Sequence, residues 1–171
     1  MQDHRYSFEI DATPEELWRV FWGRKKGDVL EHGDVRIEIL HAGDATGEGL
    51  VRHCHFRVPR YLLSGGKAMS WEWLTEVNPC ESWRYDAVGK PLWSKASGWT
   101  RFERLEEGRT RVHFRETYHV FNPILRFLLE RIVHRAISKD NDKEIKQSVE
   151  RGVAMMRERD ARTEDPTPSA N

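Results

Sequence analysis

Apolar and polar residues alternate with a period of two along most of the chain, and the pattern becomes helical in two places. The first alternating stretch covers residues 6–10, and the first helical pattern starts at Thr13. Thr13, Pro14 and Glu16 have the spacing of a capping box, in which the threonine caps the helix and the glutamate bonds back to it. The sequence therefore predicts a strand that runs directly into a short helix ending near Gly23.

Period-two alternation then repeats from about Val35 to Phe121, broken by segments rich in Gly, Pro, Asn and Asp. Such residues connect neighbouring antiparallel strands. The further strands are predicted at residues 35–41, 49–58, 68–77, 82–88, 96–105 and 109–121. Because no helical pattern interrupts them, we expect an antiparallel sheet of about seven strands rather than a doubly wound parallel sheet.

The pattern becomes helical again after Asn122 and Pro123, a second pair of N-cap and first-turn residues. An apolar stripe runs from Leu125 to Ile137, weakens around Asp140 and resumes from Ile145 to Met156. At a rise of 1.5 Å per residue, about 35 residues span roughly 50 Å. The sequence therefore predicts a C-terminal helix long enough to cross the whole sheet.

Length and composition indicate one domain, which we place at residues 1–159, followed by a disordered polar tail at 160–171. The 28 basic and 28 acidic side chains cancel, so we expect no nucleic-acid partner. The chain contains no apolar run of membrane-spanning length and opens without the apolar core of a signal peptide. With only two cysteines, these features favour a cytoplasmic location and no integral membrane segment.

The order of strand, capped helix, antiparallel meander and long terminal helix resembles the helix-grip (SRPBCC or START-like) superfamily. This superfamily includes the birch pollen allergen-like proteins, the START lipid-transfer domains and the bacterial polyketide cyclase/dehydrase family. The resemblance is carried by "FEIDATPEELWRVF" (8–21), "EGRTRVHFRETY" (107–118) and the amphipathic segment 122–156. Residues 23–35 depart from the pattern of many relatives, which place a short helix there.

The resemblance implies an α+β helix-grip fold, in which a strongly curved antiparallel sheet wraps around the C-terminal helix. It also implies a cavity between sheet and helix that holds an apolar ligand. The partner expected on this basis is a hydrophobic small molecule or a lipid.

Alternation also assigns each strand residue to the face that meets the helix or to the face that meets water. The candidate ligand-binding residues on the inner face are Arg52, Cys54, Phe56, Trp71, Trp73, Tyr85, Glu116 and Tyr118. Arg52 and Glu116 occupy positions that are otherwise apolar, and a buried charge must be paired, hydrated or neutralised. The two residues therefore pair with each other, contact a ligand, or reach water at the rim. The tryptophans either line a pocket or fill the core.

The stretch "VRHCHFRV" contains three potential metal ligands in a row, His53, Cys54 and His55. The pleat of a strand places the two histidines on the outer face and the cysteine on the inner face, so the three cannot bind one ion. No CxxC or HExxH motif supplies further ligands, and "SGGK" and "GDATGEG" lack the strand-to-helix context of nucleotide-binding loops. We therefore expect neither a metal nor a cofactor.

Three functions fit these features. The first is a binding protein that holds a hydrophobic molecule for carriage, storage or sensing. The second is an enzyme resembling polyketide cyclases or dehydratases, in which Arg52 stabilises an enolate, Glu116 acts as base, and Tyr118 or His41 moves a proton. The third is an interaction module that acts through its outer face. No spacing in the sequence assigns a catalytic residue, so whether the protein is an enzyme stays open here.

Overall fold

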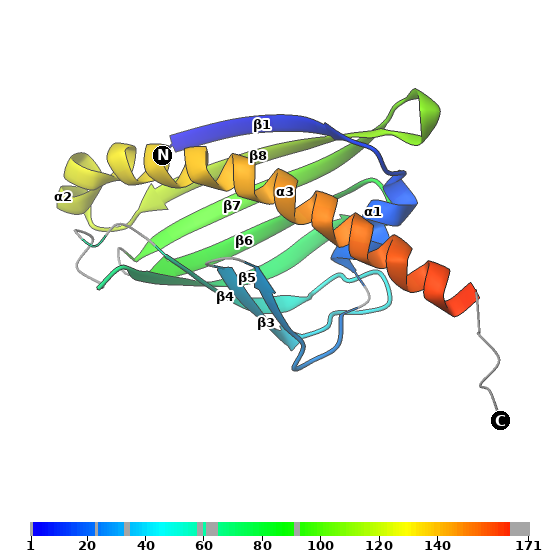
Figure 1. Ribbon diagram of the computed structural model, residues 1–171. Helices are drawn as coiled ribbons and strands as arrows, with labels where there is room; N and C mark the ends of the chain where they lie inside the picture. The colour runs from blue at the N-terminus through cyan, green and yellow to red at the C-terminus, as the bar shows by residue number, and fades with distance from the viewer. Residues whose placement is uncertain are drawn as a thin grey trace.

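The computed structural model describes residues 2–22, 24–32, 35–57, 60, 65–90 and 93–164. They form a curved antiparallel sheet of eight strands, and a long C-terminal helix runs along one face of it (Figure 1). The strands are β1 (Gln2–Ile10), β2 (Val29–His32), β3 (Val35–His41), β4 (Val51–Arg57), β5 (Lys67–Asn78), β6 (Ser82–Lys90), β7 (Ser94–Arg104) and β8 (Thr110–Val120). Their order across the sheet is β1-β8-β7-β6-β5-β4-β3-β2, so β1 at one edge pairs with the last strand.

The first helix, α1 (Pro14–Phe21), begins at the predicted capping box. The hydroxyl of Thr13 accepts the backbone N–H of Glu16 at 3.3 Å, and the Glu16 carboxylate accepts the N–H of Thr13 at 2.9 Å. Leu17 is fully buried and anchors α1 to the core. Gly23, the predicted end of this helix, lies outside the described residues.

The C-terminal helix begins at the predicted cap. The Asn122 side chain accepts the backbone N–H groups of Ile124 at 3.0 Å and Leu125 at 3.1 Å. Its successive segments are α2 (Pro123–Leu125), the π-helical turn η3 (Arg126–Glu130) and α3 (Arg131–Glu164). None of the helices in the described part of the chain has an apolar run of the length needed to cross a membrane.

The predicted start of the disordered tail at residue 160 was wrong, because α3 continues to Glu164. In this last part of the helix, Asp160 pairs with Arg19 of α1 at 2.9 Å. An ion pair to another element ties the helix end to the fold, which composition alone does not reveal. Residues 165–171 lie outside the described residues.

Strand β2 is the strand that the alternation did not predict. It forms the edge opposite β1 and pairs with β3, from Val29 opposite Glu38 to His32 opposite Val35. Its sequence "VLEH" has two adjacent apolar residues and no alternation, so period-two analysis missed it. The sheet therefore has eight strands rather than about seven.

The core lies between the inner face of the sheet, α1 and the second half of α3. Its buried apolar residues are Phe8, Ile10, Ala12, Leu17, Ile39, Leu50, Leu74, Trp83, Phe102, Val112, Val149 and Val153. Where α3 crosses α1, a Cβ on Gly152 would lie 2.6 Å from Val20, so only glycine allows this approach. These features confirm the predicted α+β helix-grip architecture.

Candidate functional site

The structure places most of the predicted site residues on the inner face of the sheet, as expected. The residues with this orientation are Arg52, Cys54 and Phe56 on β4, Tyr85 on β6, and Glu116 and Tyr118 on β8. On β4 the assignment follows from the register, because Arg52 lies opposite the buried Ile39 of β3. On the other face the rings of His53 and His55 lie side by side, with centroids 4.2 Å apart.

The predicted orientation of β5 was wrong. The ring of Trp71 stacks on His53 of the outer face, with centroids 4.6 Å apart, and Trp73 is 37% exposed. Leu74 is buried instead, and Glu72 points inward. The large apolar side chains were assigned to the inner face because apolar surface is usually buried. Here the indoles of Trp71 and Trp73 lie on the outer face, and the carboxylate of Glu72 lies on the inner face, where it pairs with Arg52.

His41 was also predicted to face inward, and this was wrong as well. The register of β3 shifts between Ile39 and His41, which turns the histidine to the exposed surface. There its Nδ1 accepts the backbone N–H of Gly43 at 3.0 Å. A bulge moves every later side chain to the other face, and a single sequence gives no sign of where it occurs.

Arg52 pairs with Glu72 rather than with Glu116. Its Nε and Nη2 donate to one carboxylate oxygen of Glu72 at 2.8 and 2.7 Å, and the Ser70 hydroxyl donates to the other oxygen at 2.8 Å. Burial opposes ionisation of Glu72, but the charge of Arg52 and these hydrogen bonds hold its pKa below the ordinary value. Burial likewise opposes the charge on Arg52, and attraction to Glu72 outweighs it and raises the pKa. Both groups therefore stay charged inside the fold.

The buried thiol of Cys54 lies beside this ion pair. Burial and the neighbouring Glu72 carboxylate raise its pKa to about 12. A cysteine reacts as its thiolate, and with this pKa the thiol of Cys54 stays protonated at neutral pH, which does not suit a nucleophile.

A second polar pair lies on the same face, where the hydroxyl of Tyr85 on β6 donates to the carboxylate of Glu116 on β8. The tyrosine reaches across β7 because Gly98 lies beneath its ring. A Cβ on Gly98 would come within 2.5 Å of the Tyr85 Cζ and closer still to its Cε1. Sequence reasoning missed this role, although a glycine inside a strand often marks such a close approach.

The surroundings of Glu116 favour its protonated form. Burial raises its pKa, the charges of Glu72 and Asp142 raise it further, and the hydrogen bond from Tyr85 and the nearby His4 oppose this only in part. His4 of β1 lies directly opposite Glu116 and binds Asp142 of α3 through Nε2 at 2.8 Å. The site therefore reaches from β4 to β1 and includes a side chain of the helix. Neither His4 nor Asp142 has a sequence signal that would have marked it.

Replacing Glu116 with glutamine is expected to stabilise the protein at neutral pH. The folded-state pKa of Glu116 is raised, so its favourable contribution is present below the unfolded pKa and is lost as pH rises through the folded value. Glutamine mimics the protonated form and still accepts from Tyr85, so its advantage should grow with pH. Thermal unfolding midpoints measured from acid to neutral pH check this.

Glu103→Gln is the control, because the pKa of Glu103 is shifted in the opposite direction. Glu103 is exposed, and its hydrogen bond with His113 and the charge of Arg111 lower its pKa. Its replacement should leave the midpoint unchanged or slightly reduced at neutral pH. A lower midpoint for Glu116→Gln than for the wild type at neutral pH would contradict the assigned environment.

A curved antiparallel sheet with a long C-terminal helix along one face defines a helix-grip protein. The family model described as "Polyketide cyclase / dehydrase and lipid transport" matches residues 1–151. The chain belongs to this family. No curated protein matches the sequence at a significant level.

Solved structures from several bacteria share the fold. A protein from Thermus thermophilus, TTHA0849, is 18% identical with a TM-score of 0.63, covering 91% of this chain and 99% of that one. A START superfamily protein from Mycobacterium smegmatis is 10% identical with a TM-score of 0.61, covering 90% and 98%. The Zhui aromatase/cyclase from a Streptomyces species is 15% identical with a TM-score of 0.60, covering 99% of both chains. At these identities the similarity establishes the fold.

Proposed function

We propose that the protein binds a mainly apolar small molecule or lipid between the inner face of the sheet and α3. The observation that carries this proposal is the accessible surface of the ion pair. Arg52 and Glu72 lie on the inner face, yet their side chains keep 26% and 13% of their surface accessible, while Ile39 beside Arg52 is buried. Protein interiors are close-packed, so accessible surface on charged inner side chains indicates space beside them.

The polar groups suit one end of such a ligand. Arg52 uses Nε and Nη2 on Glu72, and a guanidinium has five N–H donors in all, so donors remain for a carbonyl, hydroxyl or carboxylate oxygen. The neighbouring inner residues Ala87 and Leu74 are apolar and buried. A few fixed polar groups within an apolar wall are typical of small-molecule sites. The ligand class that matches has an apolar body and one oxygen-bearing end.

The expected result of native mass spectrometry is a retained mass that disappears on denaturation and is recovered by organic extraction. Arg52→Met together with Glu72→Met removes both charges and should abolish retention of a ligand with a polar end. Arg84→Met is the matched control, because Arg84 pairs with Glu76 on the outer face. Wild-type protein that carries no mass and binds no fatty acid, sterol or aromatic compound would refute the proposal.

A second candidate function is acid–base chemistry of the polyketide cyclase type, and the environment of Glu116 favours it. A carboxyl group whose pKa is raised by burial is better matched to proton transfer near neutral pH. Glu116 would take the proton from a carbon next to a carbonyl, while Arg52 would stabilise the enolate oxygen. Turnover of a poly-β-ketone substrate should fall by about 100-fold or more in Glu116→Gln. Unchanged turnover excludes this base while leaving ligand binding untouched.

A further inference from the structure

The outer face of β1, β8 and β7 is charged, and its charges are arranged in rows across the strands. One row is balanced, because Arg111 lies directly between Glu9 and Glu103 and pairs with them at 2.7 and 3.4 Å. Opposite charges on neighbouring strands stabilise a sheet in this way, and like charges placed directly opposite destabilise it. The balanced row is therefore the arrangement expected of a surface with only a structural role.

The next two rows break this pattern. Arg5 of β1 lies directly opposite Arg115 of β8. In the adjacent row, Arg101 of β7 lies directly opposite His113 of β8. Two arginines thus face one another in the first of these rows. In the second row an arginine faces a histidine that is hydrogen-bonded to Glu103 at 2.8 Å. The like charges of Arg5 and Arg115 favour an anion between them.

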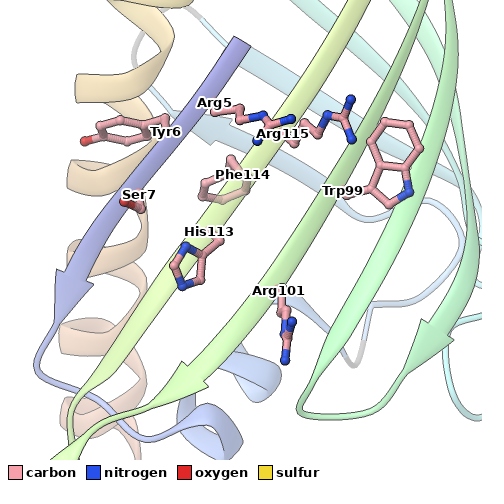
Figure 2. A pocket seen from close by; sticks show the side chains of 8 residues that line it. All are labelled: Arg5, Tyr6, Ser7, Trp99, Arg101, His113, Phe114 and Arg115. Atoms are coloured by element: carbon pink, nitrogen blue, oxygen red, sulfur yellow. The ribbon is translucent and has the colours of Figure 1, made fainter. Parts of the chain in front are cut away.

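These two rows line a groove of about 370 Å³ on the outer side of the sheet. Its lining residues are Arg5, Tyr6, Ser7, Trp99, Arg101, His113, Phe114 and Arg115. No carboxylate is among them. Figure 2 shows Arg5 extending toward Arg115, the Arg115 guanidinium beside Trp99, and His113 and Arg101 in the next row.

The carboxylates around the groove neutralise these cations only in part. Asp3 accepts from Arg115 at 3.2 and 3.1 Å, and the same carboxylate is the partner of Arg5 at 3.8 Å. The Arg5 side chain is 72% exposed. Within the part of the chain that the structure describes, no carboxylate lies within 4.0 Å of the Arg101 guanidinium. One aspartate thus serves two arginines, and Arg101 has its donors available.

Trp99 gives the groove a rigid wall. The guanidinium carbons of Arg84 and Arg115 lie 5.1 and 5.6 Å from its ring centre. Cation–π contacts of this kind hold the Arg115 guanidinium in place and limit its loss of freedom when a ligand binds. The Ser7 hydroxyl, which also lines the groove, adds a neutral donor.

We propose that this groove binds the phosphate group of an anionic ligand, at a site separate from the inner face. A guanidinium fork matches two oxygens of a phosphate, and Arg5, Arg101 and Arg115 all line this groove. A phosphate carries more charge than a carboxylate and so compensates three arginines better. The site lies on the opposite side of the sheet from Arg52, so a ligand here does not compete with one bound beneath α3.

Inorganic pyrophosphate is the probe, titrated at constant ionic strength and followed through the indole N–H signal of Trp99. We expect saturable binding that weakens at least tenfold in Arg101→Ala, which corresponds to about 1.4 kcal/mol. Arg36→Ala is the matched control, because Arg36 is also a half-exposed arginine on a strand and its pair with Glu31 is long, at 3.9 Å. The control should bind like the wild type. Both variants change exposed side chains and should keep the wild-type unfolding midpoint.

Vesicles distinguish the two sources of a phosphate group. Sedimentation with phosphatidylcholine vesicles that contain phosphatidylglycerol, displaced by pyrophosphate, assigns the site to a lipid headgroup. Pyrophosphate binding without vesicle binding assigns it to a soluble phosphate compound. The proposal is overturned if neither probe binds. It is also overturned if Arg101→Ala and Arg36→Ala weaken binding equally, since binding would then reflect the overall charge of the protein and not this groove.

Discussion

Replacing Arg52 with methionine is expected to lower the free energy of unfolding by about 3 kcal/mol. Methionine replaces the aliphatic stem of the arginine but removes the partner of Glu72, whose carboxylate then remains on the inner face without its guanidinium. Removing one member of a buried ion pair costs more than the pair contributes, because the remaining charge is left uncompensated. The value lies at the low end for such pairs because both side chains keep some accessible surface. Urea unfolding of the purified variant measures it.

The double variant Arg52→Met/Glu72→Met separates charge from packing. With both charges removed, most of the lost stability should return, since an apolar pair of similar volume commonly replaces a buried ion pair without loss. Arg84→Met, on the outer face, should cost less than Arg52→Met, because Glu76 is 61% exposed and Asp86 keeps its hydrogen bond from Ser97. If the double variant loses as much as the two single variants together, the ion pair is not the source of the effect.

Gly98→Ala is expected to cost about 3 kcal/mol, although it adds a single methyl group to a strand. The new Cβ would overlap the ring of Tyr85, so the ring must leave its position above β7. The tyrosine hydroxyl then no longer reaches Glu116, and a buried carboxyl group loses its donor. Chemical denaturation reports the loss of stability, and the near-ultraviolet circular dichroism of the displaced tyrosine should change with it.

Gly89→Ala is the matched control for this substitution. Gly89 also lies in a strand, on β6, but a Cβ there would come no closer than 3.3 Å to the Ser94 hydroxyl. This variant should lose about 1 kcal/mol or less. Combining Gly98→Ala with Tyr85→Leu should recover part of the lost stability by removing the overlapping ring. Equal stability of Gly98→Ala and the wild type would refute the assigned role of this glycine.

Local chemistry explains what the sequence could predict. The caps at Thr13 and Asn122 depend on neighbouring residues only, and both are present as predicted. The inner orientation of Arg52 and Glu116 follows from simple alternation along β4 and β8, where apolar neighbours of the same parity mark the buried face. The order of these elements also sufficed to predict the fold.

The remaining features depend on partners far away in the sequence. Glu72 faces inward because its partner Arg52 lies on the neighbouring strand, and no pattern within β5 carries that information. His4 and Asp142 meet across almost the whole length of the chain. Because Arg52 pairs with Glu72, the alternative that Arg52 and Glu116 neutralise each other is excluded. The ligand-binding role of the inner residues stays a prediction until the mass measurements are made.

The tyrosine that lies over Gly98 has a consequence for the size of ligand that the proposed site would admit. A ring that lies along the sheet takes only its own thickness from the space above the strands, whereas a tyrosine standing upright would project across that space. Gly98 therefore determines how far the Tyr85 ring projects from the sheet toward α3, in addition to letting Tyr85 reach Glu116. Under the proposed function, ligand selection by size would thus depend on a residue that has no side chain to contact the ligand.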